Sequence, residues 1–237
     1  MLPLFVCPSP LLLPSPSKLK EAIVVVIDIL RATTSICACL HNGAMGIIPL
    51  ETVAEALLFK RQEYLIAGER NGYKIEGFDF GNSPSEFSPE RVKGKKIAMA
   101  TTNGTRAIRK AQKAHQVIAG AFSNFSMLCN YLRNQNRPLY LLCAGWQNEV
   151  ALEDMFFAGA LCHALVDAFY LEQDAAHIAR QIYLNESEKQ NLLLKASHLK
   201  RLHNFQKQND IQLCFAKDIY PTLPYLNKQG EIISLLV

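Results

Sequence analysis

Short apolar runs alternate with longer amphipathic segments along the first part of this sequence. Residues 22–27, AIVVVI, form a continuous β-branched run, which is typical of a parallel strand covered on both faces. Residues 32–40 permit a helix, Asn42-Gly43 supplies a left-handed stop, and residues 46–50 are apolar again. The pattern therefore predicts a strand, a helix and a second strand in succession.

The same alternation continues as far as Cys143. It predicts helices over 52–62, 106–114 and 127–134, and strands over 64–67, 97–100, 117–121 and 139–143. Strands that alternate with helices favour a layered α/β domain with a largely parallel sheet.

Beyond Trp146 the pattern is mostly helical. It predicts helices over 150–169, 175–184 and 186–206, followed by strands over 211–215 and 231–236. No linker separates two halves and no internal repeat is present, so we expect a single domain over residues 1–237.

Composition indicates a globular protein and argues against nucleic acid and membrane as partners. Hydrophobic residues make up 49% of the 237 residues and charged residues 19%, and the net charge of +4 is too small to indicate a nucleic-acid surface. No run approaches the roughly 20 apolar residues of a membrane span. The apolar N-terminus lacks an early positive charge and is interrupted by prolines, unlike a signal peptide. We expect neither nucleic acid nor membrane as a partner.

The seven cysteines are odd in number and lack C-x-x-C spacing. Cys37 and Cys39 are separated by one residue, and Cys129, Cys143, Cys162 and Cys214 lie in apolar surroundings that are typical of buried free thiols. This pattern favours a reducing, cytoplasmic compartment.

Polar residues gather directly after the predicted strands. Asp28 and Arg31 follow the first strand, and Glu69 and Arg70 follow the strand at 64–67. Ligands of open α/β sheets bind beyond the carboxyl ends of the strands, so these side chains are candidates for a functional site. Asp residues also begin turns and cap helices without any chemical role, which is the alternative at each position.

The segment TTNGTR, residues 101–106, lies between a predicted strand and a predicted helix. Its glycine lets the backbone approach a ligand, and its hydroxyls and amides suit a phosphate or sulfonate. The candidate anion-binding residues are Thr102, Asn103, Gly104 and Thr105. An ordinary capped turn is the alternative. The sequence has neither the dinucleotide-binding G-x-G-x-x-G pattern nor a Walker A loop.

Acidic residues accompany this anion loop. Glu69, Glu76 and Asp79 lie in a polar, Gly-rich stretch over 68–87. A carboxylate about 4 Å from a phosphate would be repelled by about 4 kcal/mol per pair of unit charges at an effective dielectric near 20, so a cation must intervene. Oxygen ligands favour Mg²⁺, and the six histidines lack zinc-site spacing.

A second acidic pair, Glu153 and Asp154, opens the predicted helix after Trp146. Metal binding and helix-dipole stabilisation are equally good explanations for this pair. Two phosphatase designs are excluded. Asp28 lacks a second Asp two residues later, and neither Cys37 nor Cys143 has the Arg six residues later that a thiolate phosphatase needs.

Several long segments, taken together and in order, resemble the 2-phosphosulfolactate phosphatase family, the ComB proteins of coenzyme M biosynthesis. The segments are VVVIDILRATTSI (24–36), AGERNGYKIEGFDFGNSPSEF (67–87), TTNGTRAI (101–108), CAGWQNEVALEDMFFAGAL (143–161) and the late SHLKRL (197–202). The resemblance extends from a strand near Pro3 to this late motif. Residues 146–150 and the lack of a glycine in SHLKRL depart from the pattern.

The resemblance implies a three-layer α/β/α sandwich with a largely parallel or mixed sheet. It also implies Mg²⁺-dependent hydrolysis of the phosphate ester of a small 2-hydroxy acid, in this family 2-phosphosulfolactate. The alternatives are a module that binds a phosphorylated metabolite without turnover and a different Mg²⁺-dependent phosphoryl-transfer enzyme. A homo-oligomer is compatible with either.

This hypothesis gives the candidate residues the following roles. Asp28, Glu76, Asp79 and Glu153 would be metal ligands, Arg31 and residues 102–105 would hold the phosphoryl oxygens, and Arg70, His198 and Arg201 would bind the carboxylate and sulfonate ends. Asp28 is the first choice for a nucleophile or metal bridge, Asp79 a further catalytic candidate, and Asp154 a candidate general acid or base.

Overall fold

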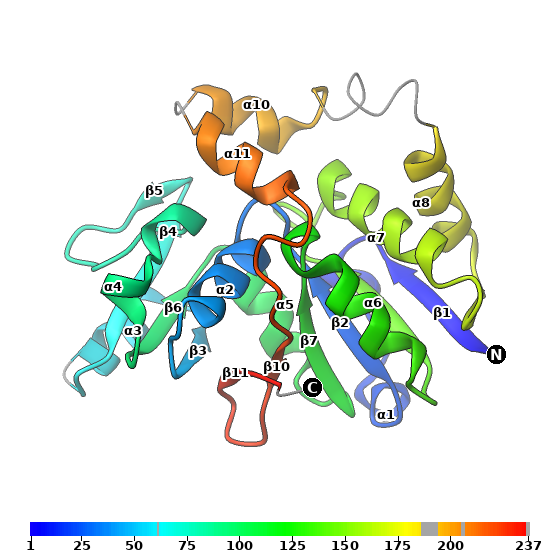
Figure 1. Cartoon of the computed structure of the whole chain (residues 1–237), viewed down its shortest axis with the longest axis horizontal. Coiled ribbons are helices and arrows are strands. Elements are labelled where there is room, and N and C mark those ends of the chain that lie inside the picture. Colours follow the sequence, from blue (N-terminus) through cyan, green and yellow to red (C-terminus); the bar gives the residue numbers. More distant parts are fainter. Residues whose placement is uncertain (61, 186–193, 205–206, 236–237) are drawn as a thin grey trace.

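The computed structural model of the chain describes residues 1–60, 62–185, 194–204 and 207–235, and these form an α/β sandwich with helices on both sides of one mixed sheet (Figure 1). In sheet order the strands are β5 (Tyr73–Lys74), β4 (Leu65–Arg70), β6 (Lys96–Ala100), β3 (Gly46–Leu50), β11 (Ile232–Ser234), β10 (Pro224–Leu226), β7 (Gln116–Gly120), β2 (Ile23–Ile27), β8 (Leu139–Cys143), β1 (Leu2–Cys7) and β9 (Phe169–Leu171).

The sheet consists of two parallel blocks. One block contains β4, β6 and β3, and the other contains β7, β2, β8, β1 and β9. The hairpin β10–β11 lies between them and pairs antiparallel with β7 on one side and β3 on the other. The predicted α/β class with a largely parallel or mixed sheet is confirmed.

Helices follow most of the strands. They are α1 (Pro16–Leu19), α2 (Ala32–His41), α3 (Val53–Lys60), α4 (Pro89–Val92), α5 (Gly104–Ala111), α6 (Phe125–Arg133), α7 (Leu152–Ala164), α8 (Asp174–Leu184), α10 (Ser197–Asn204) and α11 (Gln208–Phe215). Single 3₁₀ turns are η1 (Pro10–Leu12), η2 (Pro84–Glu86) and η3 (Phe122–Asn124).

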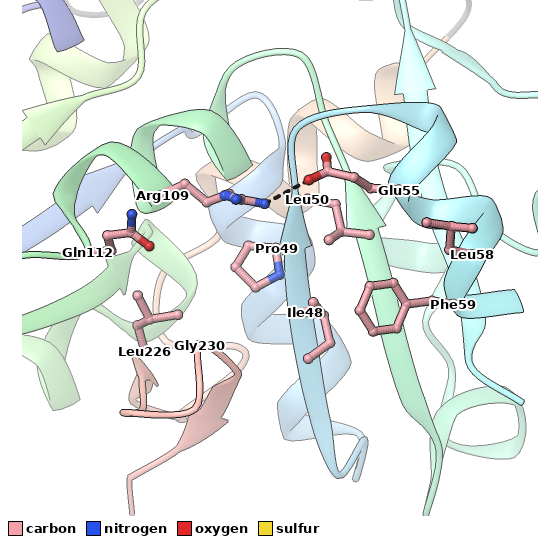
Figure 2. Close-up of a pocket in the computed structure, with 10 residues that line it drawn as sticks. All are labelled: Ile48, Pro49, Leu50, Glu55, Leu58, Phe59, Arg109, Gln112, Leu226 and Gly230. Carbon is pink, nitrogen blue, oxygen red and sulfur yellow. Dashed lines mark hydrogen bonds and ion pairs between the residues drawn. The ribbon is translucent and has the colours of Figure 1, made fainter. Parts of the chain in front are cut away.

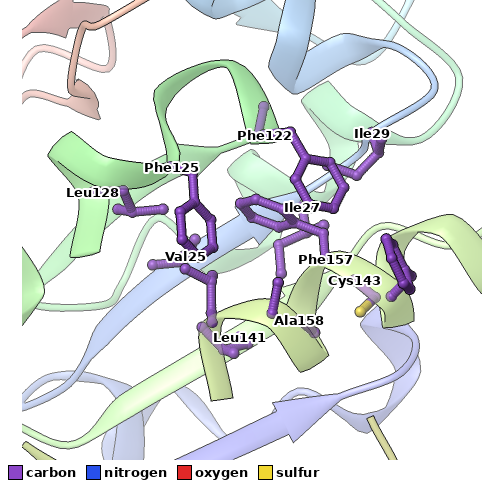
Figure 3. Close-up of a cluster of buried hydrophobic side chains, with 14 of the residues drawn as sticks. Val25, Ile27, Ile29, Phe122, Phe125, Leu128, Leu141, Cys143, Phe157 and Ala158 are labelled. Atoms are coloured by element: carbon purple, nitrogen blue, oxygen red, sulfur yellow. The ribbon is translucent and has the colours of Figure 1, made fainter. Parts of the chain in front are cut away.

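The central strand β2 is buried along its whole length because both of its faces are covered. Val25 and Ile27 pack with aromatic residues of η3, α6 and α7, as Figure 3 shows for Phe122, Phe125 and Phe157. The alternate residues Val24 and Val26 belong to a second cluster on the other face, with Leu19, Ala107 and Ile108 of α1 and α5. Alternation along a strand sends successive side chains to opposite faces, which is why a continuous apolar run was needed here.

Three predictions for the last third of the chain need correction. The predicted strand at 211–215 is helical and belongs to α11, and the predicted helix over 150–169 ends at Ala164, with Phe169 starting the edge strand β9. Of the predicted helix over 186–206, residues 186–193 and 205–206 lie outside the described residues, and α10 covers only 197–204. Short apolar runs do not distinguish a strand from one buried face of a helix, so tertiary packing decides.

All seven cysteines are free and buried, which confirms the prediction for Cys129, Cys143, Cys162 and Cys214. Burial raises the pKa of the Cys37 thiol to about 12, although a hydrogen bond with Ser123 opposes the shift. A thiolate nucleophile at this position is therefore unfavourable near neutral pH. Among the described residues, no helix is long and apolar enough to cross a membrane.

Candidate functional site

A narrow polar cleft forms where strand ends from both blocks approach α10. Its cavity volume is about 50 Å³. Figure 1 shows α10 and α11 above this part of the sheet. The cleft is lined by Asp28, Leu30, Arg31, Glu69, Asn71, Gly72, Asn82, Thr101, Thr102, Asn103, Trp146, Gln147, His198 and Leu202.

Asp28 directly follows β2 and stands at the start of α2. Its Oδ1 accepts a 3.3 Å hydrogen bond from the amide of Ala32, and its own amide donates to Thr33 Oγ1 at 3.2 Å. The side chain is only 7% exposed. Burial raises its pKa to about 6, an effect that the charge of His198 and the Ala32 bond oppose and that Glu69 adds to. A carboxylate held in this way favours a cation beside it.

Glu69 and the anion loop are joined by hydrogen bonds. Glu69 Oε1 accepts from the amide and the hydroxyl of Thr102 at 2.9 and 2.7 Å, and Oε2 accepts from the amide of Gly72 at 2.9 Å. Burial alone would raise the pKa of Glu69, but the bonds from Gly72 and Thr102 outweigh it and hold the pKa below its usual value. Glu69 therefore stays ionised and fixes the loop after β6.

The start of α5 packs directly against the start of α2. A Cβ on Gly104 would lie 2.7 Å from Asp28 Oδ2 and would collide with the Cβ of Ala32, so only glycine allows this approach. Thr105 faces away from the cleft, since its hydroxyl donates to Leu50 O at 2.6 Å and it is fully buried. Of the predicted anion loop, Thr102 and Asn103 line the cleft, together with Thr101.

Glu153 and Asp154 at the start of α7 have different surroundings. Glu153 Oε1 lies 2.8 Å from His198 Nδ1, which joins α7 to α10. Asp154 Oδ1 accepts from the amide of Ile29 at 2.9 Å and Oδ2 from the amide of Gly145 at 3.1 Å. Burial, with the charges of Glu153 and Asp28, raises the pKa of Asp154 well above its usual value. Asp154 thus links the segments that follow β2 and β8.

The segment after β8 forms a tight turn that carries the aromatic wall of the cleft. Trp146 and Glu149 exchange two backbone hydrogen bonds of 3.1 and 2.9 Å, and the two central residues, Gln147 and Asn148, have φ of 52° and 67°. This is the geometry of a type I′ turn. The turn places Trp146 and Gln147 on the cleft, with the Trp146 ring 6.2 Å from that of His198. The departure at 146–150 noted in the sequence therefore shapes the cleft wall.

Arg31 reaches the cleft while bound to α11. Its Nη1 donates to Asp210 Oδ2, and its Nη2 donates to Gly72 O at 3.4 Å. Ser83 Oγ also donates to Asp210. Both members of the ion pair are 4% exposed at the side chain. Since a guanidinium has more N–H donors than these bonds use, Arg31 can still donate to a ligand in the cleft.

Three predicted residues are placed elsewhere. Asp79 accepts a 2.8 Å hydrogen bond from the amide of Ile66 at the start of β4, and Glu76 is exposed. The Arg70 guanidinium donates to backbone carbonyls, including Glu69 O at 2.8 Å. The structure does not bring these three side chains into the cleft. Arg201 lies on α10, but its side chain is outside the described part of the chain.

Sequence reasoning missed other residues of the site. Asn82 lines the cleft, yet the candidates from the stretch 68–87 were its acids and Arg70, although Gly81-Asn82 was an equally visible turn signal. Asp210 carried no local signal, because it immediately precedes the strand predicted over 211–215 and meets Arg31 only in three dimensions.

The cleft residues fit a hard divalent cation such as Mg²⁺. Asn82 Oδ1 is buried and has no hydrogen-bond partner among the residues that the structure describes, and the charges of Glu69 and Glu153 act on Asp28. The described residues contain no group of three or more His, Cys, Asp or Glu side chains able to hold a metal ion. Mg²⁺ usually takes one or two protein carboxylates and completes its shell with water and substrate phosphate, so the fit does not need such a group.

An apolar cavity lies away from this chemistry. It has a volume of about 340 Å³, and Figure 2 shows its walls from β3, α3, α5 and the β10–β11 hairpin. An ion pair of 3.1 Å between Arg109 and Glu55 spans its edge. It shares no lining residue with the cleft.

A buried acidic cleft beside an anion loop, on an α/β sandwich, is the site of a phosphate-handling protein. The sequence model of 2-phosphosulpholactate phosphatase matches residues 8–229. The chain belongs to that phosphatase family, as its motifs predicted.

Similar curated proteins carry the name of the same phosphatase. The chain is 40% identical over 213 residues to a probable 2-phosphosulfolactate phosphatase of Thermotoga maritima, with 90% of this chain and 91% of the relative covered. It is also 40% identical over 222 residues to a protein of the same name from Caldanaerobacter subterraneus, with the same coverage. A probable 2-phosphosulfolactate phosphatase of Clostridium acetobutylicum is 36% identical over 223 residues, which cover 91% of this chain and 94% of the relative.

Proposed function

We propose that this protein hydrolyses 2-phosphosulfolactate to sulfolactate and inorganic phosphate in a Mg²⁺-dependent reaction. The observation that carries the proposal is the buried Asp28 carboxylate, which follows β2 and faces the start of α5 within the anion loop. Family membership supports the reaction class, and the names of the relatives support the substrate. The buried free thiols favour a cytoplasmic setting.

Mg²⁺ would be held by Asp28 and the orphaned Asn82 Oδ1, with Glu69 and Glu153 adding negative charge around it. When bound, the ion neutralises phosphoryl charge and polarises the phosphorus centre. Glu76 and Asp79 are not part of this proposal, because neither lines the cleft.

The chain's own donors would orient the phosphoryl group. Arg31 points into the cleft with its orientation fixed by Asp210, and Thr102 and Asn103 form the wall beside α5. The helix start gives this wall a positive partial charge. Positioning and charge stabilisation supply most of the rate enhancement in phosphoryl transfer, and these residues provide both.

His198 would interact with the ester oxygen of the leaving group. Its Nδ1 is held by Glu153 Oε1, which leaves Nε2 for the cleft. In the hydrolysis a water oxygen bonds to phosphorus, the bond from phosphorus to the ester oxygen breaks, and that oxygen takes up a proton. A proton or hydrogen bond from Nε2 would stabilise the charge that develops on the ester oxygen.

A phosphate-release assay tests the proposal. The purified protein is incubated with 2-phosphosulfolactate in Mg²⁺, in EDTA, and in EDTA followed by excess Mg²⁺. We expect release in Mg²⁺, loss of more than about a hundredfold in EDTA, and recovery when the ion returns. Full activity in EDTA would remove Mg²⁺ from the proposal. Binding of 2-phosphosulfolactate without release under any condition would instead identify a metabolite-binding module.

A further inference from the structure

A second polar cavity adjoins the cleft on the other side of the anion loop. Its volume is about 400 Å³, and it shares Thr102 and Asn103 with the cleft. Its walls come from η1, the loop before α5, α5 itself, the residue after β3 and the segment after β8. It is lined by Pro10, Leu11, Glu51, Thr102, Asn103, Arg106, Ala107, Arg109, Lys110, Ala144 and Asn148. We call this cavity the α5 groove.

The α5 groove presents two cations without an acidic partner. Arg106 and Lys110 form no ion pair within the described part of the chain, whereas Arg109 pairs with Glu51 at 3.3 Å and with Glu55 at 3.1 Å. Figure 2 shows the Arg109–Glu55 pair turned toward the apolar cavity. Glu51 is the sole acid among the lining residues, and Arg106, Arg109 and Lys110 outnumber it, so the groove has an excess of positive charge.

The positions of Arg106 and Lys110 destabilise α5 when no anion is bound in the groove. Arg106 and Lys110 are four residues apart, so they lie on the same face of α5 and repel each other. Arg106 is also in the first turn of α5, near the positive end of the helix dipole, and that turn contains no acidic residue. An anion in the groove would relieve both effects.

The proposed substrate needs cations that the cleft does not supply. Besides its phosphate, 2-phosphosulfolactate carries a carboxylate and a permanently ionised sulfonate. The cleft holds Asp28 and Glu69, and its proposed cationic partners, Arg31 and Mg²⁺, are assigned to the phosphoryl group. The Arg70 guanidinium, a sequence candidate for the distal anions, donates to the carbonyls of Glu69, Ala100 and Glu51.

We propose that the α5 groove is the subsite for the sulfonate end of the substrate, with Arg106 and Lys110 as its specificity-determining donors. The inference rests on the proposed function for the identity of the substrate. With the phosphoryl group in the cleft, the shared wall of Thr102 and Asn103 lets the rest of one small molecule extend into the groove. A sulfonate offers three oxygens to a guanidinium and an ammonium, which donate charge-assisted hydrogen bonds.

The test compares two substrates that differ only in the sulfonate. For Arg106→Gln/Lys110→Gln and for wild type, kcat/KM is measured with 2-phosphosulfolactate and with 2-phospholactate, which lacks the sulfonate. We expect the ratio of the two values to fall by at least about tenfold in the variant, as for the loss of charge-assisted hydrogen bonds. An unchanged ratio would overturn the inference. Lys95→Gln/Lys113→Gln removes the same charge from exposed lysines that line neither cavity, and should keep the wild-type ratio.

A binding measurement separates this inference from the proposed reaction. Calorimetry with sulfolactate, in the presence of Mg²⁺, should show affinity at least about tenfold weaker for Arg106→Gln/Lys110→Gln than for wild type and for the lysine control. If wild type hydrolyses neither substrate but this difference appears, the reaction is wrong and the sulfonate subsite stands. Equal affinity in all three proteins would remove the subsite, whatever the enzyme hydrolyses.

Discussion

The floor of the cleft comes from residues that directly follow strands, whereas its cover comes from helices near the C-terminus. On the floor, Asp28 follows β2 and Thr101 follows β6. In the cover, His198 of α10 is tied to Glu153, and Asp210 of α11 is tied to Arg31, a residue 179 positions earlier in the chain.

Residues of the floor and of the cover are held in place by different kinds of interaction. Floor residues are oriented by neighbouring backbone, as when the Ala32 amide holds Asp28. Cover residues act through buried side-chain pairs that exist only when α10 and α11 are docked. A substitution on the floor should therefore change chemistry with the fold retained, and a substitution in the cover should change stability together with chemistry.

The largest effect is expected for Asp28→Asn. Loss of the carboxylate removes the proposed metal contact, and kcat/KM should fall at least about a thousandfold, which is about 4 kcal/mol of transition-state stabilisation. Phosphate release from 2-phosphosulfolactate measures it, with circular dichroism to verify folding. Asp167→Asn, an exposed surface carboxylate, is the control. Near wild-type turnover by Asp28→Asn would leave this residue as a helix cap.

Asp210→Ala tests the cover. It leaves the Arg31 guanidinium buried without its partner, so the free energy of unfolding should fall by about 3 kcal/mol, as for other broken buried pairs. Urea denaturation measures the loss. The double substitution Arg31→Met/Asp210→Leu should recover most of that stability, because no buried charge remains, while activity stays low. A cost below about 1 kcal/mol for Asp210→Ala would show that the pair does not hold the cover.

The pKa of Asp28 predicts a stability gain from the variant that loses activity. Burial raises this pKa to about 6, above the ordinary value of 3.8 for an Asp carboxyl. Between these pH values the folded state binds more protons than the unfolded state, so the carboxyl lowers stability as pH rises through that window. Metal-free Asp28→Asn should thus exceed wild type by up to about 3 kcal/mol at pH 8 and by less at pH 4.5.

Chemical denaturation at the two pH values, in EDTA, checks this gain. Excess Mg²⁺ should then narrow the difference at pH 8, because an ion that binds only the native wild-type site stabilises it. A difference between the two proteins that does not change with pH would mean that Asp28 does not titrate in this window.

Thr102→Val should have the smallest effect. It removes the 2.7 Å hydroxyl bond to Glu69 Oε1 but keeps the backbone bond, so the free energy of unfolding should drop by about 1 kcal/mol. Thermal denaturation is the measurement. Thr102→Ser keeps the hydroxyl and should match wild type. Equal losses in both variants would point to packing of the Thr102 methyl group instead of the hydrogen bond.

The floor was largely predictable, whereas in the cover His198 was a candidate through the family resemblance and Asp210 was missed. The apolar run at 22–27 and its abrupt end at Asp28 mark a buried strand and its carboxyl terminus, and the loop 101–106 shows its turn chemistry locally. By contrast, the segment around Asp210 was assigned to the wrong element, and the acids Glu76 and Asp79 were grouped with the site because they are near Glu69 in sequence.

Local sequence patterns were enough to predict the α/β class, the family and which strands end in polar residues, because apolar periodicity and turn residues act over a few neighbours. Three further facts depend on how the chain packs: Asp79 accepts a hydrogen bond at the start of β4, Asn82 lines the cleft, and Asp210 pairs with Arg31. Those outcomes depend on which buried polar groups meet after the chain has packed. Each buried charge must find a partner there, and sequence distance does not limit the choice.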